Sequence, residues 1–385
     1  MNSLPASLRH LRDYVAIPSV NPMGRTDLSD EVAGETRLAE HLREQLRGMG
    51  VDAELVGAGN RCSVLADIPC SESNAETVLV ASHIDTVPVD GMEISPFDPR
   101  IDDGRLYGRG SCDTKAGMAA LVAALAQVLE RGRLRRRLIL VGEADEELGS
   151  LGVRDVLATL GGRRPDWVLA TEPTELRVVH AHKGVVHVRV EASGRACHAS
   201  NPDAGQNAVV ALARATVALA DLGETLKAVD HPLLGHPTIS VGRAAGGSAP
   251  NIVPDQAELI ADRRTLPGES PENVSAEIQE ALVQVGVQES VRVASCRLEK
   301  PALGTPPDHP SVSTCLDALR KARWAPETGT VAFGTDAGVF EVEAGLPGVV
   351  MGPGSIDRAH TSREFVETAQ VEAMTRFFVA LLSGD

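Results

Sequence analysis

The residues with the clearest chemical potential are His83 and Asp85, which come directly after the apolar run of residues 77–81. This run predicts a buried strand of a parallel sheet, and residues two apart on a strand share a face. Both side chains are therefore expected at the carboxyl end of the strand, where open α/β sheets bind ligands. A histidine can bind a metal through one ring nitrogen while a carboxylate holds the other. Taken alone, the pair also fits an ordinary polar surface.

Further histidines and carboxylates follow other strand-like runs along the chain. They are Asp113, Glu146, Glu147, Glu172 and His360. Because the carboxyl ends of parallel strands meet at one edge, we expect these side chains in one cleft. A mixed set of imidazole and carboxylate ligands suits zinc, manganese or cobalt. Clustered carboxylates without cations would raise one another's pKa values and destabilise the fold, which favours two metal ions that share a bridging carboxylate.

The adjacent acids Glu146 and Glu147 divide the possible roles between them. Neighbouring side chains diverge, so one carboxylate can bind metal while the other faces the substrate water as a general base. The alternative is a solvated acidic turn before a helix, where carboxylates favour the helix N-terminus.

The elements that must position these residues form an α/β pattern with an insertion. Residues 1–177 and 297–385 alternate apolar strand-like runs with helical stripes, as in a larger α/β domain. Residues 178–296 instead predict the order β-α-β-β-α-β of a compact α+β domain. Its elements are expected near residues 185–191, 207–220, 238–241, 256–262, 271–286 and 291–295. In the larger domain, helices are expected near residues 32–48, 116–130, 150–160, 311–322 and 367–382.

Composition narrows the class of partners. The chain has 385 residues and a formal net charge of −16, which argues against a nucleic-acid partner because phosphate binding needs a basic face. The six cysteines form no CxxC pattern and suggest free thiols in a reducing compartment. We find no leader sequence and no apolar segment long enough to span a membrane, so a cytoplasmic protein is expected.

At this point the motifs resemble a known family. Residues 83–88, 108–113, 146–149 and 171–174 resemble those of the co-catalytic zinc aminoacylase and carboxypeptidase family. Acetylornithine deacetylase, succinyl-diaminopimelate desuccinylase and glutamate carboxypeptidase are members. The resemblance covers nearly the whole chain. It implies a mixed-sheet catalytic domain with an inserted ferredoxin-like α+β domain that serves as lid and mediates dimerisation.

The resemblance also assigns roles to the predicted metal ligands. His83 and Glu172 would bind one Zn²⁺, Glu147 and His360 the other, and Asp113 would bridge both; Co²⁺ or Mn²⁺ could substitute. Asp85 would brace the His83 side of the site. Glu146 would take a proton from the attacking water and pass it to the leaving amine. The Asp113–Thr114 peptide bond is expected to be cis.

Further site residues are implied in and beside the inserted domain. His198 would enter the active site of the partner subunit in a homodimer and support the oxyanion. Asn251 and Arg264 would hold the substrate carboxylate, a task that suits a guanidinium group. Gly334 and Thr335 are expected to line the substrate pocket. Without the resemblance, His198 would be read as a turn residue and Arg264 as a solvated strand end.

Within the family, residues 182–184, 333–338 and 352–360 resemble acetylornithine deacetylases. Two departures stand near the expected pocket: Asp336 replaces the usual Glu, and residues 361–364 replace the common Lys-Pro-Asp-Glu. The expected activity is hydrolysis of an N-acyl-L-amino acid, N-acetylornithine first, as in arginine biosynthesis. Three alternatives remain: another deacylase such as a succinyl-diaminopimelate desuccinylase, a zinc carboxypeptidase or dipeptidase, and a metal-free relative that only binds an acylated ligand.

Overall fold

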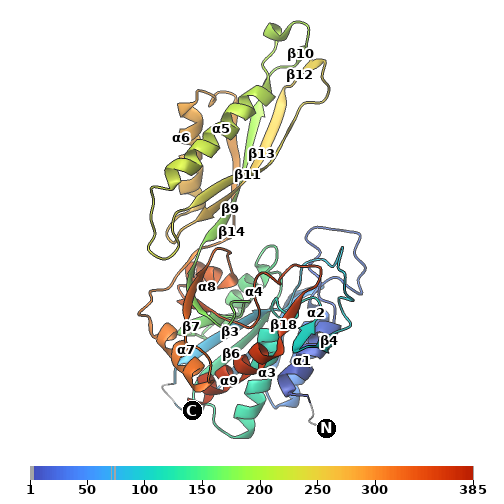
Figure 1. Cartoon of the computed structure of the whole chain (residues 1–385), viewed down its shortest axis with the longest axis vertical. Coiled ribbons are helices and arrows are strands. Elements are labelled where there is room, and N and C mark those ends of the chain that lie inside the picture. Colours follow the sequence, from blue (N-terminus) through green and yellow to red (C-terminus); the bar gives the residue numbers. More distant parts are fainter. Residues whose placement is uncertain (1–3, 71, 73–74, 385) are drawn as a thin grey trace. The chain divides into compact units, whose positions relative to one another are not determined.

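The computed structural model describes residues 4–70, 72 and 75–384. The chain divides into two compact units, each of which is described by itself (Figure 1). Unit 1 comprises Met1–His180, Gly304–Gly329 and Thr335–Asp385, and unit 2 comprises Ala181–Leu303 and Thr330–Gly334. A larger α/β unit is thus interrupted by an inserted unit, which confirms the predicted fold class.

A mixed sheet forms the centre of unit 1. Its strands follow the order β1 (Ala53–Ala58), β2 (Arg61–Ile68), β6 (Arg137–Glu143), β3 (Thr77–His83), β7 (Trp167–Ala170), β17 (Gly348–Val350), β8 (Val178–His182) and β15 (Leu303–Gly304), and β16 (Thr328–Val331) pairs with β8. Strand β3 runs parallel to β6 and β7, and β17 runs parallel to β7. The carboxyl ends of these neighbouring strands therefore lie at the same edge of the sheet.

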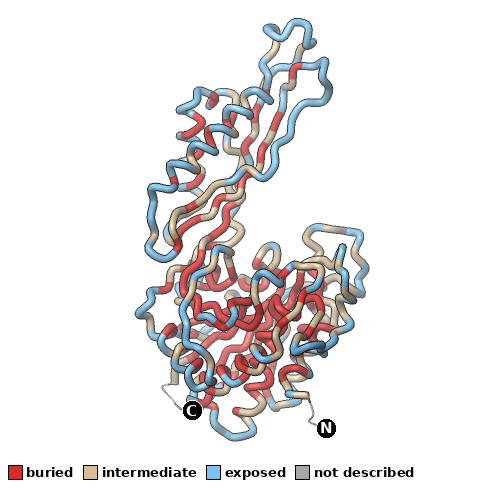
Figure 2. Tube along the Cα trace, in the orientation of Figure 1, coloured by how far each residue is buried: buried red, intermediate tan, exposed pale blue. Residues whose placement is uncertain are grey.

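Helices cover both faces of this sheet because its strands are apolar on both sides. In β3, Val78 and Val80 pack into one core cluster, whereas Leu79 and Ala81 pack into another. The first face carries α1 (Ala6–Ala16), α2 (Thr36–Gly48), α3 (Lys115–Glu130), α7 (Pro310–Lys321) and α9 (Thr368–Ser383). The second face carries α4 (Leu151–Leu160) and α8 (Asp336–Ala344). Figure 2 shows the buried residues concentrated in the middle of unit 1, where the strands of this sheet lie in Figure 1.

A small antiparallel sheet in unit 1 lies next to two loops that carry predicted metal ligands. It consists of β4 (Arg100–Asp102), β5 (Arg105–Tyr107) and β18 (Phe365–Glu367), with β5 in the centre. Strand β5 leads directly into the loop of residues 108–114, and β18 directly follows the loop of residues 352–364. Because Phe365 pairs with Tyr107, the two loops are held side by side.

Unit 2 is an antiparallel sheet covered on one face by two helices. Its order along the chain is β9 (Gly184–Ser193), α5 (Ala208–Leu226), β11 (Thr238–Gly246), β13 (Gln256–Thr265), α6 (Pro271–Gln284) and β14 (Val291–Lys300), the predicted β-α-β-β-α-β arrangement. Alternate residues of β9 and β13, such as Val188 and Leu259, pack under the helices. A short ribbon of β10 (Cys197–His198) and β12 (Ile252–Val253), with the 3₁₀ turn Pro202–Ala204, extends the unit beyond the sheet.

Two element boundaries differ from the expectation. Helix α2 begins at Thr36 rather than near residue 32, because Val32 and Gly34 pair with Val20 instead. Gly34 has a φ of +87°, and a Cβ there would lie 2.5 Å from the carbonyl oxygen of Asn60. Strand β14 runs on to Lys300, beyond its expected end near residue 295.

The structure also bears on membranes and disulfides. None of the helices that the structure describes has the length and apolar character needed to cross a bilayer. The cysteines are free thiols, as their spacing predicted.

Candidate metal centre

Neighbouring parallel strands of unit 1 bring three of the predicted ligands to one edge of the sheet. His83 is the last residue of β3, Glu147 follows β6, and Glu172 follows β7. Every residue of β3 is buried, so its apolar run fixes the strand in the core and leaves His83 at the polar end. The register that aligns His83 with Glu143 places the loop carrying Glu147 beside it.

Loops on either side of the small sheet supply the other two predicted ligands. Asp113 ends the loop that follows β5, directly before α3, and His360 lies in the loop that precedes β18. The hydroxyl group of Thr114 donates a hydrogen bond to the carbonyl oxygen of His83, which joins the Asp113 loop to β3. The Asp113–Thr114 peptide bond is cis, as expected.

The donor atoms of the predicted ligands converge on Asp113. Oδ1 of Asp113 lies 3.0 Å from Nε2 of His83, and its Oδ2 lies 3.2 Å from Nε2 of His360. Each of the two histidines also has a second carboxylate nearby. Oε1 of Glu172 lies 4.0 Å from Nε2 of His83, and Oε1 of Glu147 lies 3.2 Å from Nε2 of His360. His83, Asp113 and Glu147 each place a donor atom within 4.8 Å of the others'.

Asp85 connects the two halves of this cluster. Nδ1 of His83 lies 3.1 Å from the backbone carbonyl oxygen of Asp85 and 3.3 Å from its Oδ1, so the other ring nitrogen faces the cluster. The same carboxylate accepts the backbone N–H groups of Glu146 and Glu147 at 3.1 and 3.0 Å. Asp85 therefore orients both the histidine of one half and the acidic loop of the other, a wider role than bracing His83.

The cluster attracts positive charge. Hydrogen bonds to Asp113 and Glu147 raise the pKa of His360 to about 10. Burial lowers the pKa of His83, but hydrogen bonds to Asp113 and Asp85 outweigh it and the net pKa is raised. Burial likewise raises the pKa of Asp113, yet its bonds to the two imidazoles bring the net pKa down. Bound protons thus balance the buried carboxylates, a task that divalent cations also perform.

The donor set fits a pair of divalent cations. Imidazole Nε2 atoms and carboxylate oxygens are ordinary ligands of Zn²⁺, and a carboxylate whose two oxygens face different histidines can bridge two ions. The partner of Nδ1 on His83 is the kind of carboxylate that orients a metal-binding histidine. The described residues therefore form a candidate metal site at the carboxyl edge of the sheet.

The predicted residues of unit 2 fall into two separate places. His198 and Asn251 lie together on the ribbon, where His198 pairs with Ile252 and the carbonyl of Asn251 accepts the N–H of Ala199. Arg264 lies near the carboxyl end of β13, and its Nε donates to Oδ1 of Asp262 at 2.8 Å. The structure does not bring these two places together within the unit.

Gly334 and Thr335, expected in the substrate pocket, are engaged in the scaffold. Thr335 is fully buried and is the N-cap of α8, where its hydroxyl oxygen accepts the N–H of Ala337. A Cβ on Gly334 would lie 2.5 Å from Cβ of Lys300, so the position demands glycine for packing. Asp336, the next residue, is buried and accepts the hydroxyl of Ser150 at 2.6 Å, which fastens the acidic loop to α8.

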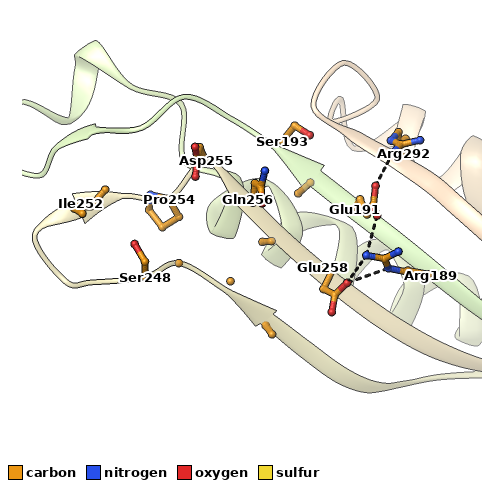
Figure 3. A pocket seen from close by; sticks show the side chains of 15 residues that line it. Arg189, Glu191, Ser193, Ser248, Ile252, Pro254, Asp255, Gln256, Glu258 and Arg292 are labelled. Atoms are coloured by element: carbon orange, nitrogen blue, oxygen red, sulfur yellow. Dashed lines mark hydrogen bonds and ion pairs between the residues drawn. The ribbon is translucent and has the colours of Figure 1, made fainter. Parts of the chain in front are cut away.

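A cavity of about 600 Å³ lies on the helix-free face of unit 2, and its lining includes Ile252, the strand partner of His198 (Figure 3). Four of its five charged side chains form ion pairs with one another: Arg189 contacts Glu191 and Glu258 at 3.0 and 2.9 Å, and Arg292 contacts Glu191 at 2.6 Å. The residues that line the cavity include none of the predicted site residues. We therefore place the candidate site at the metal cluster of unit 1.

Sequence reasoning missed two residues that support the cluster. The side-chain amide of Asn21 donates to Asp85 and to Asp145, each at 3.0 Å. Glu364 accepts hydrogen bonds from the backbone of the Asp113 loop. Asn21 carries no local signal, because it is a single polar residue in a loop. Glu364 lies in the segment that follows His360, and its closeness in sequence to this predicted ligand could have indicated its role.

The sequence and the fold are both similar to those of known proteins. Residues 79–384 match peptidase family M20/M25/M40. Acetylornithine deacetylase from Erwinia tasmaniensis is 32% identical over 387 aligned residues, which cover 98% of this chain and 97% of that protein. The aminopeptidase PepT from Bacillus cereus shares the fold, with a TM-score of 0.79, 21% identity and coverage of 98% and 97% of the two chains. So does a dinuclear metal-binding M20 peptidase from Bacillus subtilis, with a TM-score of 0.72, 16% identity and coverage of 98% and 96%.

Proposed function

The chain belongs to peptidase family M20/M25/M40 and is a hydrolase of amide bonds, and we propose that it removes the acyl group from an N-acyl-L-amino acid, N-acetylornithine first. The observation that carries the proposal is Asp113, whose two carboxylate oxygens each face a histidine that is paired with a further carboxylate. The 32% identity to an acetylornithine deacetylase over nearly the full length supports the choice of substrate. The proposed setting is arginine biosynthesis in the cytoplasm.

The chain's own residues would divide the work as follows. His83 and Glu172 would hold one divalent cation, Glu147 and His360 the other, and Asp113 both. Cations held there, Zn²⁺ first, would act as Lewis acids on the amide carbonyl and lower the pKa of water. Glu146 would accept the proton of the attacking water and pass it to the leaving amine nitrogen. Arg264, with five N–H donors, and Asn251 would hold the α-carboxylate of the substrate.

The layout of unit 2 supports a site completed by a second copy of the chain. His198 and Asn251 lie at the ribbon that precedes β13, whereas Arg264 lies near the other end of this strand. At about 3.3 Å per residue, the stretch from Gln256 to Arg264 spans roughly 26 Å. A single small substrate cannot reach both ends. In a two-fold symmetric dimer, the ribbon of one subunit and the Arg264 of the other can serve the same substrate.

Unit 2 also offers a surface for such a dimer. Strand β11 is an edge strand of the sheet, and residues 242–246 of it are exposed. Unpaired edges of this kind readily add a strand from a second chain. Helix α5, which packs against β11, exposes Val209, Val210 and Val217. We therefore propose that the homodimer forms through β11 and α5.

We expect the purified protein to bind two divalent ions per chain after loading with Zn²⁺. A chelator should abolish hydrolysis, because the carboxylates that hold the ions cannot replace their Lewis-acid function. The thermal midpoint should also fall on chelation, since ligands that bind the folded state stabilise it. Elemental analysis and thermal denaturation measure both effects. Full activity in metal-free protein would contradict the proposed chemistry.

A substrate panel tests the proposed reaction. We expect the zinc-loaded protein to hydrolyse N-acetyl and N-succinyl amino acids, with N-acetylornithine among the best, and to leave dipeptides largely intact. Faster hydrolysis of dipeptides or tripeptides would assign the chain to the peptidases of the family. Fastest hydrolysis of N-succinyl substrates would keep the mechanism and change the substrate. Metal binding without turnover of any member would favour a ligand-binding relative.

A further inference from the structure

Glu364 is a fully buried carboxylate that holds the Asp113 loop from within. Its Oε2 accepts the N–H of Gly110 at 3.0 Å and Nη1 of Arg109 at 2.6 Å. Its Oε1 accepts the N–H groups of Cys112 and Asp113 at 2.9 and 3.1 Å. Each oxygen therefore receives two donors, and one of those donors belongs to the proposed bridging residue itself.

The Arg109–Glu364 pair joins three segments that carry proposed metal ligands. Glu364 ends the loop that contains His360, and its backbone carbonyl accepts the N–H of Gly108 at 3.1 Å. Arg109 belongs to the Asp113 loop, and its Nη2 donates to the carbonyl of Pro88 at 3.3 Å. Pro88 ends the segment that begins at His83. The Arg109–Glu364 pair thus connects the three segments that carry His83, Asp113 and His360.

The Asp113 loop needs such an acceptor. Gly108 and Gly110 have φ values of +146° and +81°, so the backbone of the loop is neither a strand nor a helix. Its N–H groups therefore have no partners from regular secondary structure. Buried backbone donors must find partners, and a carboxylate accepts several of them more strongly than a neutral group does. A buried ion pair is costly to desolvate and often adds little net stability. The orientation of the Asp113 loop therefore explains the buried Arg109–Glu364 pair better than a gain in stability does.

We propose that Arg109 and Glu364 are positioning residues that set Asp113 between His83 and His360 and so create the affinity of the site for two divalent ions. This inference rests on the proposed function, because it requires that the cluster binds metal. Glu364 itself faces the backbone of the loop and not the donor atoms of the cluster.

Replacing Glu364 with glutamine tests the proposal. In Glu364→Gln, an amide NH₂ must face two of the donors in either orientation of the side chain, so the loop shifts. We expect the affinity for Zn²⁺ to fall about 10- to 100-fold, the usual cost of losing a residue that orients ligands. Competition with a chromophoric chelator measures the affinity, and thermal denaturation of metal-free protein measures the stability separately. A purely structural role predicts lower stability with unchanged zinc affinity, and that result would overturn the proposal.

The same small sheet provides a matched control. Glu367 pairs with Arg105 at 2.9 Å, is about 40% exposed, and lies on β18 three residues from Glu364, where its side-chain hydrogen bond goes to Arg105 and not to the Asp113 loop. Glu367→Gln should bind Zn²⁺ as the wild type does. If Glu364→Gln does not fold, Arg109→Lys replaces it, since a lysine keeps the charge but lacks the planar fork through which Arg109 contacts Glu364 and Pro88 with different nitrogens. A several-fold loss is expected there, and wild-type affinity would overturn the proposal. Failure of the wild type to bind Zn²⁺ would instead reject the proposed function.

Discussion

Replacement of Glu146 by glutamine is expected to lower kcat by about 10²- to 10⁴-fold, the usual contribution of a general base, while both metal ions stay bound. Glu147 rather than Glu146 belongs to the cluster of donor atoms around His83 and Asp113. Glu146 is buried beside it, and Asp85 holds its backbone N–H. Glutamine keeps the size of the side chain but cannot accept the proton of the attacking water.

The neighbouring acid serves as the control for this prediction. Glu147→Gln removes a carboxylate that lies 3.2 Å from Nε2 of His360, so it should weaken one metal site. Steady-state kinetics at saturating Zn²⁺, together with metal analysis, separates the two variants. If Glu146→Gln kept near-normal turnover, or if it lost metal while Glu147→Gln did not, the roles of the two acids would be exchanged.

Much of the arrangement could be predicted from the sequence because the strands are local features. The apolar runs before His83 and Glu172 are long enough to mark buried parallel strands, and such strands end at a common edge. The convergence of His83, Glu147 and Glu172 follows from this rule, and the structure shows it. The order of strands and helices predicted for unit 2 is likewise the observed one, and the alternating burial along β9 and β13 shows that one face of its sheet is covered.

The contacts that fix the ligand geometry could not be predicted in this way. Glu364 and Arg109 are 255 positions apart, and no local sequence pattern predicts that their side chains form an ion pair. The same holds for Asn21 and Asp85, which are 64 positions apart. Thr335, which the resemblance placed in the substrate pocket, also caps the start of α8 through its hydroxyl, a contact that the sequence analysis did not predict.

The second large effect is expected at His198, which is exposed on the ribbon of unit 2. Its Nδ1 accepts the backbone N–H of Ser200 at 3.2 Å, so a neutral imidazole carries its proton on Nε2. Nδ1 also lies 2.7 Å from the hydroxyl oxygen of Ser200, and Nε2 is the ring nitrogen that remains to donate a hydrogen bond to an oxyanion. Losing one such donor typically costs about 10²- to 10³-fold in kcat. His198→Ala should therefore form a normal dimer with both metal ions and turn over poorly.

A mixed dimer decides whether His198 acts in the partner's active site. When His198→Ala chains are mixed with Glu146→Gln chains, one site of each mixed dimer carries both defects. The other has its own Glu146 and the His198 of the partner subunit, so it is intact. With random exchange of equal amounts, half of the dimers are mixed, and activity should rise to about a quarter of the wild-type value per chain. Native mass spectrometry verifies the exchange. If mixed dimers form and activity stays at the level of the separate variants, His198 acts within its own chain or not at all, because a site composed from one chain would keep its defect.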